Sequence, residues 1–291
     1  MSTKLRMSVL DFCRVVDGTS DTDTIWNALE LARRVDKMGF DRYWVAEHHE
    51  ANVAHISPIP FITSLAGSTR RLRVGTAGVL LRYHNPYRIA GDFRFLETLF
   101  PGRLDLGLAR GFVDPAFEKC LIPEGAQPDY EKSVELVLAF LRGQGAIAVR
   151  PINVAMPEVW VLGSNRTSMQ LAAEQGTAYC LSLFLRQDTD FLAVAREYRA
   201  RFKPSIDLPA PRLAIAIAGA WGRTTQEAEL CVQAFGTAVR PRAIGPIGVW
   251  LETIERLRSE FQTDEVVVLE MSGSLDDRTR GYEKLAEGFS L

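Results

Sequence analysis

The chain has 291 residues, of which 47% are hydrophobic and 24% charged, and its 34 Lys and Arg against 36 Asp and Glu residues leave a formal charge of −2. This near-neutral balance without a basic run is unlike that of a nucleic-acid-binding protein. No apolar stretch reaches the roughly 18 residues of a membrane span. We therefore expect a globular protein with neither nucleic acid nor membrane as a partner.

The cysteines lie far apart in the sequence and form no CxxC pair. In a chain of this length, that spacing is typical of free thiols in a reducing compartment rather than of a disulfide framework or a structural zinc site. We therefore expect a cytoplasmic protein. The four cysteines are Cys13, Cys120, Cys180 and Cys231.

Short apolar runs rich in Val, Ile and Leu recur along the chain and predict buried strands. In chain order, they cover residues 6–12, 42–47, 72–81, 103–109, 159–163, 178–184, 212–220 and 265–270. Amphipathic segments alternate with them and predict helices. The helices are expected over residues 25–38, 86–100, 130–141, 167–175, 188–202, 225–235, 249–261 and 276–289.

Eight strands that alternate with eight helical segments predict an α/β fold, a single parallel (β/α)8 or TIM barrel. The pattern covers residues 1–291 as one domain. A doubly wound sheet is the alternative, but it usually has fewer strands. Neither a GxGxxG nor a phosphate-binding GxxxxGK[ST] sequence follows the first expected strand, which argues against a Rossmann or P-loop site.

Histidines gather where the second and third expected strands end, at the rim that carries function in such barrels. His48 and His49 follow the second strand, His84 follows the third, and His55 lies in a loop just beyond. A zinc site is one interpretation, and capping of carbonyl groups by single histidines is another. Adjacent strand residues point to opposite faces, so His48 and His49 could not easily share a metal, and we expect none.

An anion site is indicated at the ends of the fourth and fifth strands. Arg110 follows the fourth strand, and the sequence GSNRT (residues 163–167) follows the fifth. Gly163 permits a tight turn, and the residues after it offer N–H and hydroxyl groups at a helix start, where anions are favoured. A plain N-cap by Ser164 or Asn165, or a structural ion pair of Arg110, remains possible.

With these residues in view, the chain resembles the bacterial-luciferase-like flavin monooxygenases over nearly its whole length. The order and spacing of the matching segments are specific, although each segment is weak alone. The segments are FDRYWVAEHH (40–49), LRVGTAGVLL (72–81), HNP (84–86), FPGRLDLGLARGF (100–112), VWVLGSNRTSMQLAAEQG (159–176) and DEVVVLEMSGSLDDRTRGYEKLAEGF (264–289).

The resemblance implies that reduced FMN binds at the carboxyl-terminal mouth of the barrel. Arg110 is at the position of an arginine on the flavin phosphate. Ser164 and Thr167, on the loop that begins at Gly163, are at positions that hold the same phosphate.

Three further residues take roles from the resemblance. His48 is at the position of a histidine implicated in catalysis, and its imidazole is suited to general acid–base work. Ala77 and Gly78 correspond to a pair joined by a non-prolyl cis peptide beneath the flavin ring. The family's luciferase carries a cysteine before the phosphate arginine where this chain has Ala109, which argues against light emission but not against oxygen chemistry.

Aromatic and polar side chains near the expected strand ends are candidates for a substrate pocket that excludes water. Segments 111–129 and 240–248 are short compared with those of many family members, so the resemblance does not identify the substrate. The candidates are Phe12, Trp44, His84, Phe112, Phe184 and Trp221.

The activity implied by the resemblance is two-component monooxygenation of a small organic substrate with reduced FMN and O2. A separate flavin reductase would supply the reduced FMN, because the sequence shows no nicotinamide-binding motif. Hydride transfer with the deazaflavin coenzyme and a non-catalytic flavin-binding partner subunit are the alternatives. By analogy with the family, we expect a homodimer formed through helices near the second and third strands.

Overall fold

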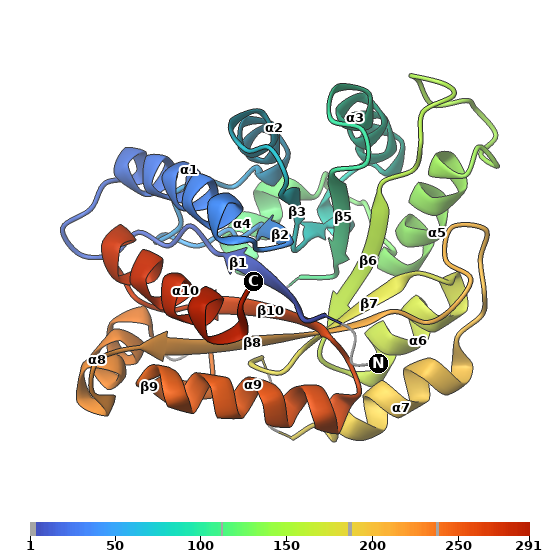
Figure 1. Ribbon diagram of the computed structural model, residues 1–291. Helices are drawn as coiled ribbons and strands as arrows, with labels where there is room; N and C mark the ends of the chain where they lie inside the picture. The colour runs from blue at the N-terminus through green and yellow to red at the C-terminus, as the bar shows by residue number, and fades with distance from the viewer. Residues whose placement is uncertain (1–3, 112, 186–187, 237–238) are drawn as a thin grey trace.

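The computed structural model describes residues 4–111, 113–185, 188–236 and 239–291, and it shows a closed parallel β/α barrel with helices around it (Figure 1). Neighbouring strands pair in chain order from β1 to β8, and β10 pairs with both β8 and β1, which closes the ring. The strands of the ring are β1 (Arg6–Asp11), β2 (Arg42–Val45), β3 (Arg73–Thr76) with β4 (Val79–Leu80), β5 (Leu104–Ala109), β6 (Glu158–Gly163), β7 (Ala178–Ser182), β8 (Leu213–Trp221) and β10 (Glu265–Glu270).

The third position of the ring is divided, whereas the sequence predicted one strand over residues 72–81. β3 and β4 both pair with β5, and the peptide bond between Ala77 and Gly78, which separates them, is cis. A short strand, β9 (Ala243–Gly245), adds to β8 outside the ring. In the described part of the chain, nine of the ten strands therefore occupy eight barrel positions, as predicted, and β9 lies outside them.

Helices cover the outside of the ring (Figure 1). None of those in the described residues is long and apolar enough to cross a membrane. The helices are α1 (Asp21–Met38), α2 (Pro58–Ser68), α3 (Pro86–Leu99), α4 (Pro115–Leu121), α5 (Tyr130–Leu141), α6 (Arg166–Gln175), α7 (Phe191–Arg201), α8 (Thr225–Phe235), α9 (Ile247–Phe261) and α10 (Leu275–Phe289).

Two helices, α2 and α4, were not predicted. Pro58 and Pro60 interrupt the pattern of α2, but both lie in its first turn, where the backbone N–H groups have no helical partner anyway. The prediction nevertheless gave eight helices for eight strands. It missed α2, which connects two consecutive barrel strands, but it included α8, an additional helix that precedes β9.

Side chains inside the ring form layers along the barrel axis. The middle layer holds Trp44 and Trp160, whose rings are 5.3 Å apart, and Trp44 Nε1 donates a hydrogen bond of 2.8 Å to Asp105. β8 leaves room for these rings because it contributes only small residues to this interior cluster, Ala214, Ala216, Ala218 and Ala220.

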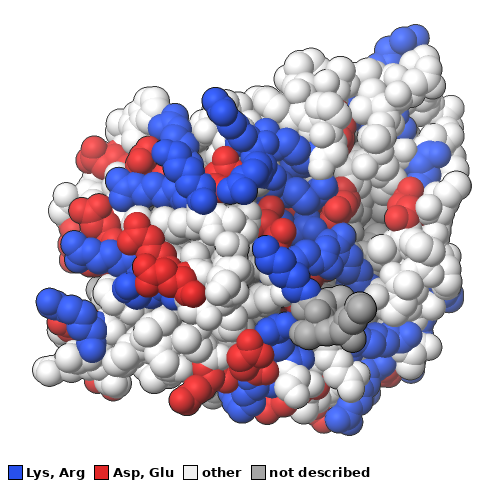
Figure 2. Space-filling model, viewed as in Figure 1, with Lys and Arg blue, Asp and Glu red and all other residues white. Residues whose placement is uncertain are grey.

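Ion pairs fill the amino-terminal end of the ring. Arg42 and Arg73 both lie 2.7 Å from Asp105, and Arg212 lies 2.7 Å from Glu158 and 2.5 Å from Glu265. Figure 2 shows basic and acidic side chains crowded together near the centre of the view, where β1 begins. We call the six residues of this group the charged layer: Arg42, Arg73, Asp105, Glu158, Arg212 and Glu265.

β3 and β5 approach closely just before the cis peptide. Thr76 Oγ1 donates a hydrogen bond of 2.9 Å to the Gly107 carbonyl and accepts one of 3.1 Å from the Gly107 N–H. A Cβ atom at Gly107 would lie 1.9 Å from the Thr76 carbonyl oxygen, so only glycine fits there. This contact fixes the backbone immediately before Ala77 and Gly78.

Candidate functional site

The residues expected to bind the flavin phosphate lie at the carboxyl-terminal ends of two neighbouring strands, β5 and β6. Leu108 of β5 pairs with Val161 of β6, so Arg110 and Gly163, each two residues further on, follow adjacent strand ends. Helix α6 begins directly after this turn, and Asn165 caps it by accepting a hydrogen bond of 3.0 Å from the Ser168 N–H. The cap is therefore Asn165, one of the two residues considered for it.

The loop before α6 is tightly packed. A Cβ atom at Gly163 would lie 2.1 Å from Ser168 Oγ, which explains the glycine at the turn. Ser164 is buried, whereas Thr167, in the first turn of α6, is exposed. The positive end of the α6 dipole and the exposed Thr167 hydroxyl are thus available beside Arg110.

Two residues at the start of α5 join this site, and the sequence interpretation missed both. The Arg110 guanidinium forms an ion pair with Glu131, and its central carbon lies 5.5 Å from the centre of the Tyr130 ring. Tyr130 is only 5% exposed, and its hydroxyl group has no hydrogen-bond partner among the described residues. Burial raises the pKa of Tyr130, so the hydroxyl remains a proton donor at neutral pH.

These groups fit a phosphate dianion chemically. Arg110 already binds a carboxylate, the Tyr130 hydroxyl is a buried donor without an acceptor in the described ranges, and the start of α6 favours negative charge. Tyr130 and Glu131 could be found from the sequence only by their place directly after Asp129, the N-cap of α5, which puts them at a helix start.

Aromatic side chains surround His48 at the carboxyl-terminal mouth of the ring. The Phe12 ring lies 4.5 Å from the His48 ring, 6.2 Å from Phe184 and 6.3 Å from Phe235, centre to centre. His48 is partly exposed, and its Nδ1 lies 3.5 Å from a Glu50 carboxylate oxygen. This contact with His48 holds the pKa of Glu50 below its usual range. Phe235, at the end of α8, had not been proposed for the pocket.

The cis peptide lies on the wall of the same interior cluster. Ala77 is partly buried and packs against the cluster that contains Phe12 and Phe184. A Cβ atom at Gly78 would lie 2.8 Å from the Gly107 carbonyl oxygen and 2.9 Å from Leu162, so this wall has no space for a larger residue. The glycine at position 78 is therefore required by the packing of this wall.

Three other pocket candidates lie elsewhere, and these expectations are corrected. Trp44 lies in the middle layer, where its indole N–H is bonded to Asp105. Trp221 ends β8 on the outward face, because the alanines that alternate with it point inward. His84 lies outside the ring, bonded to Glu47. Phe112 falls outside the described residues.

Glu47 binds two histidines that do not reach the mouth, His49 and His84. Its carboxylate accepts hydrogen bonds of 2.9 Å from the Leu80 N–H, 3.0 Å from His49 Nε2 and 2.8 Å from His84 Nε2. Burial by itself would raise the pKa of Glu47, but its bonds to His84, His49 and the Leu80 N–H hold it below its usual range. Glu47 thereby ties the end of β2 to the strand that follows the cis peptide.

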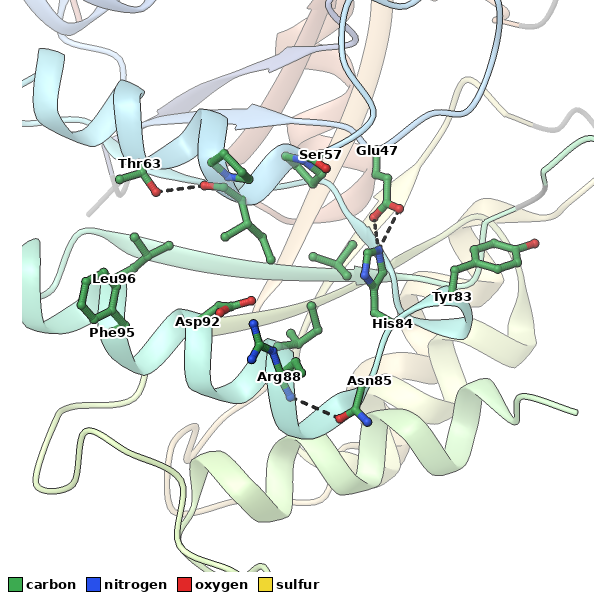
Figure 3. A pocket seen from close by; sticks show the side chains of 15 residues that line it. Glu47, Ser57, Thr63, Tyr83, His84, Asn85, Arg88, Asp92, Phe95 and Leu96 are labelled. Carbon is green, nitrogen blue, oxygen red and sulfur yellow. Dashed lines mark hydrogen bonds and ion pairs between the residues drawn. The ribbon is translucent and has the colours of Figure 1, made fainter. Parts of the chain in front are cut away.

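Glu47 also lies at one end of a cavity of about 560 Å³ between α2 and α3. Figure 3 shows Glu47 and His84 pointing toward each other there, with Thr63, Asp92 and Phe95 further along the cavity. This space lies outside the ring and is separate from the mouth at His48.

Metal ligands are not grouped in the described residues. His48 faces Phe12 at the mouth, whereas His49 is buried against Glu47, so the two neighbours diverge. Nowhere in the described ranges do three or more His, Cys, Asp or Glu side chains gather in a way that could hold a metal ion.

Comparison with known proteins identifies relatives over most of the chain. Residues 5–262 match the family described as luciferase-like monooxygenase. A luciferase-like monooxygenase of Escherichia coli K12 is 34% identical over 73% of this chain and 65% of its own length. The crystal structure of apo-MsnO8 superposes with a TM-score of 0.88 at 27% identity and covers 99% of both chains.

Two more distant structures share the fold, and their cofactors are named. The oxygenating constituent of 3,6-diketocamphane monooxygenase from Pseudomonas putida, in complex with FMN, has a TM-score of 0.75 at 16% identity, with 98% of each chain covered. An F420-dependent secondary alcohol dehydrogenase, in complex with an F420–acetone adduct, has a TM-score of 0.70 at 14% identity, also with 98% of each chain covered.

The Glu47 cluster predicts a pH-dependent stability. A carboxyl group whose pKa is lower in the folded than in the unfolded state stabilises the fold above its unfolded pKa, and this contribution is lost as the pH falls through the folded value. Glu47→Gln should therefore lower the free energy of unfolding by about 1–3 kcal/mol at pH 7. The difference from the unmodified protein should shrink below about pH 4. Urea unfolding from pH 3.5 to 7 measures it.

Glu252→Gln, on the exposed face of α9, is the matched control and should leave the free energy of unfolding nearly unchanged at every pH. A Glu47→Gln deficit that stays constant over the whole pH range would contradict the role assigned to the Glu47 carboxylate.

Proposed function

Because this chain belongs to the luciferase-like monooxygenase family, we propose that it is a two-component, FMN-dependent monooxygenase in which a separate flavin reductase supplies reduced FMN. The substrates would be O2 and a small organic molecule, and residues 1–291 would act as one flavin-binding domain. The arrangement around Arg110 carries the proposal, because a guanidinium, a buried unpaired tyrosine hydroxyl and a helix start meet at one side of the barrel mouth.

The phosphate of FMN would be bound by Arg110 with the loop that contains Gly163 and Ser164, and by the Thr167 hydroxyl. The Tyr130 hydroxyl would donate to a phosphate oxygen and so gain the acceptor that it lacks. Ala77 and Gly78 would allow the flat ring to lie against the backbone. These contacts bind and orient the cofactor.

When bound, reduced FMN supplies the electrons needed to activate O2. The protein would contribute water exclusion and proton handling. Phe12, Phe184 and Phe235 form an apolar surface around the mouth, which would shield the reaction from water. His48 lies against Phe12 with Nδ1 toward Glu50, so its other ring nitrogen, Nε2, would give or take a proton at the substrate.

Hydride transfer with the deazaflavin coenzyme is the second candidate, supported by the shared fold of the F420-dependent alcohol dehydrogenase. Anaerobic titration with reduced FMN and with reduced deazaflavin coenzyme separates the two, since the first proposal requires tighter binding of FMN. A third candidate, a non-catalytic partner subunit, would bind flavin without turnover.

We also propose an oligomeric state, a homodimer, and a cellular location, the cytoplasm. Apolar side chains on α3 and beside α2, including Phe95, Leu99 and Ile56, are at least half exposed, which supports a homodimer through this face. The four free cysteines, two of them buried, support a reducing and hence cytoplasmic location.

Flavin affinity should respond in opposite directions to two changes at the phosphate site. Arg110→Gln should weaken FMN binding about 10- to 100-fold, because a charge-assisted bidentate contact is lost. Glu131→Gln should tighten binding about two- to fivefold, because this exposed carboxylate competes with the phosphate for Arg110. Flavin absorbance and quenching of protein fluorescence measure both.

Glu135→Gln is the control for the second change, since Glu135 lies one turn further along α5 and pairs with Lys132. If Glu131→Gln and Glu135→Gln have the same effect, the tightening is a general charge effect. The competing role of Glu131 is then wrong.

Catalysis should depend on His48 more than binding does. His48→Ala should lower oxygenation about 100- to 10,000-fold, the usual contribution of a general acid or base, and change FMN affinity less than twofold. Product formation by the protein with a flavin reductase, NADH and a panel of aromatic and lipophilic substrates measures the first quantity. Full oxygenation by the His48→Ala variant would falsify this role.

The proposed dimer predicts the effect of a charge on α3. Phe95→Asp should convert a dimer at micromolar concentration into a monomer, because a carboxylate would be buried in an apolar interface. Light scattering after gel filtration measures the mass. Leu230→Asp, on the exposed surface of α8, should remain dimeric, and a monomeric unmodified protein would overturn the proposal.

A further inference from the structure

A second cavity opens at the opposite, amino-terminal end of the barrel. It has a volume of about 330 Å³, within the usual range for small-molecule sites. Among the described residues, its lining includes five arginines, Arg6, Arg42, Arg71, Arg73 and Arg212, and two acidic residues, Asp41 and Glu158. The blue side chains near the centre of Figure 2 lie on this side of the molecule.

The arginines of the cavity fall into an inner and an outer group. The inner three, Arg42, Arg73 and Arg212, belong to the charged layer, where three carboxylates balance them. The outer pair are Arg6 and Arg71. Arg6 shares Glu265, 2.5 Å away, with Arg212. Within the described residues, ion pairs thus join four of the five arginines to Asp105, Glu158 and Glu265, and Arg71 lies outside them.

Arg71 takes no part in this ion-pair network of the described residues, and the carboxylate nearest to it is that of Asp36 on α1. Its guanidinium donates to the main-chain carbonyl of Asp36, and it forms no ion pair with any carboxylate of the described residues. Its side chain nevertheless lines the cavity. A cation held by a backbone carbonyl at the edge of a cavity is placed to meet an anion from solution.

A buried donor gives a second, independent indication. Arg42 lines the cavity and is only 3% exposed, yet its Nε–H has no hydrogen-bond partner among the described residues. The two Nη atoms of Arg42 are bonded to Asp105 and Glu158, so Nε is the nitrogen of this side chain without a partner in the described ranges. Buried N–H groups in folded proteins are nearly always paired, so this donor favours an acceptor atom in the cavity.

We propose that this cavity binds a small oxyanion, a ligand with carboxylate or phosphate groups, between Arg71, Arg6 and Arg42. The site is separate from the flavin phosphate site, because Arg110 lies at the carboxyl-terminal end of β5 whereas Arg42 and Arg73 begin β2 and β3. Bidentate guanidinium contacts suit both kinds of oxyanion.

Calorimetric titration of the full-length protein tests the proposal, with inorganic phosphate and citrate as separate probes. Both titrations use the Arg110→Gln variant, so that the flavin phosphate site does not contribute. We expect saturable binding of one anion per chain, by either probe. Tighter binding of phosphate or of citrate then identifies which oxyanion the cavity prefers.

Removing the outer cation should remove this binding. Arg71→Gln in the same background should weaken it at least tenfold, and Arg6→Gln should also weaken it. Arg70→Gln is the matched control, because Arg70 is the exposed neighbour that does not line the cavity. It should change the affinity less than twofold, and thermal unfolding of each variant checks that the fold is intact.

Two results would overturn the site. One is the absence of saturable binding of both probes to the Arg110→Gln variant. The other is equal weakening by Arg70→Gln and Arg71→Gln, which would mean that anions respond only to the general positive charge of this face.

Discussion

One buried carboxylate, that of Asp105, holds the base of the barrel together. It accepts hydrogen bonds from Arg42 and Trp44 on β2 and from Arg73 on β3, while its own backbone lies in β5. Burial alone would raise the pKa of Asp105, but Arg42 and Arg73 hold it below its usual range. Loss of both arginines would leave this buried charge uncompensated, which is a costly state for a protein interior. The alignment of three consecutive strands, and hence of the ends that carry the site, depends on this group.

The two ends of the barrel accordingly differ in their chemistry. Charged groups interlock at the amino-terminal end, aromatic rings fill the middle, and the carboxyl-terminal end combines Phe12 and His48 with the Arg110 group. Glu47 performs at the rim a task similar to that of Asp105 at the base, since its carboxylate joins β2 to the strand after the cis peptide. Rigid strands thus present a site whose residues come from loops and helix starts.

The sequence was sufficient for those features that depend on local pattern. Apolar runs located the strands, and the rule that parallel strands end together placed Arg110 beside residues 163–167. The sequence was insufficient where the site depends on which face of a strand a side chain points to, or on its position along the barrel axis. Both faces of β8 are apolar, so alternation could not show that Trp221 points outward, and Trp44 faces inward but one layer too deep. Tyr130 reaches the site through the tertiary packing of α5, which brings its ring beside Arg110, and no local pattern encodes this contact.

The ion pair between Arg110 and Glu131 has a consequence for how the proposed site would respond to its surroundings. When an arginine without an anionic neighbour binds a phosphate, a new charge–charge contact forms, and added salt weakens it by screening. Here the guanidinium already has an anionic neighbour, so arrival of a phosphate would exchange one partner for another. The gain in free energy would be the difference between two contacts of the same kind, and dissolved salt would weaken both of them together. The affinity of the proposed site for flavin would therefore change less with ionic strength than that of an unpaired arginine.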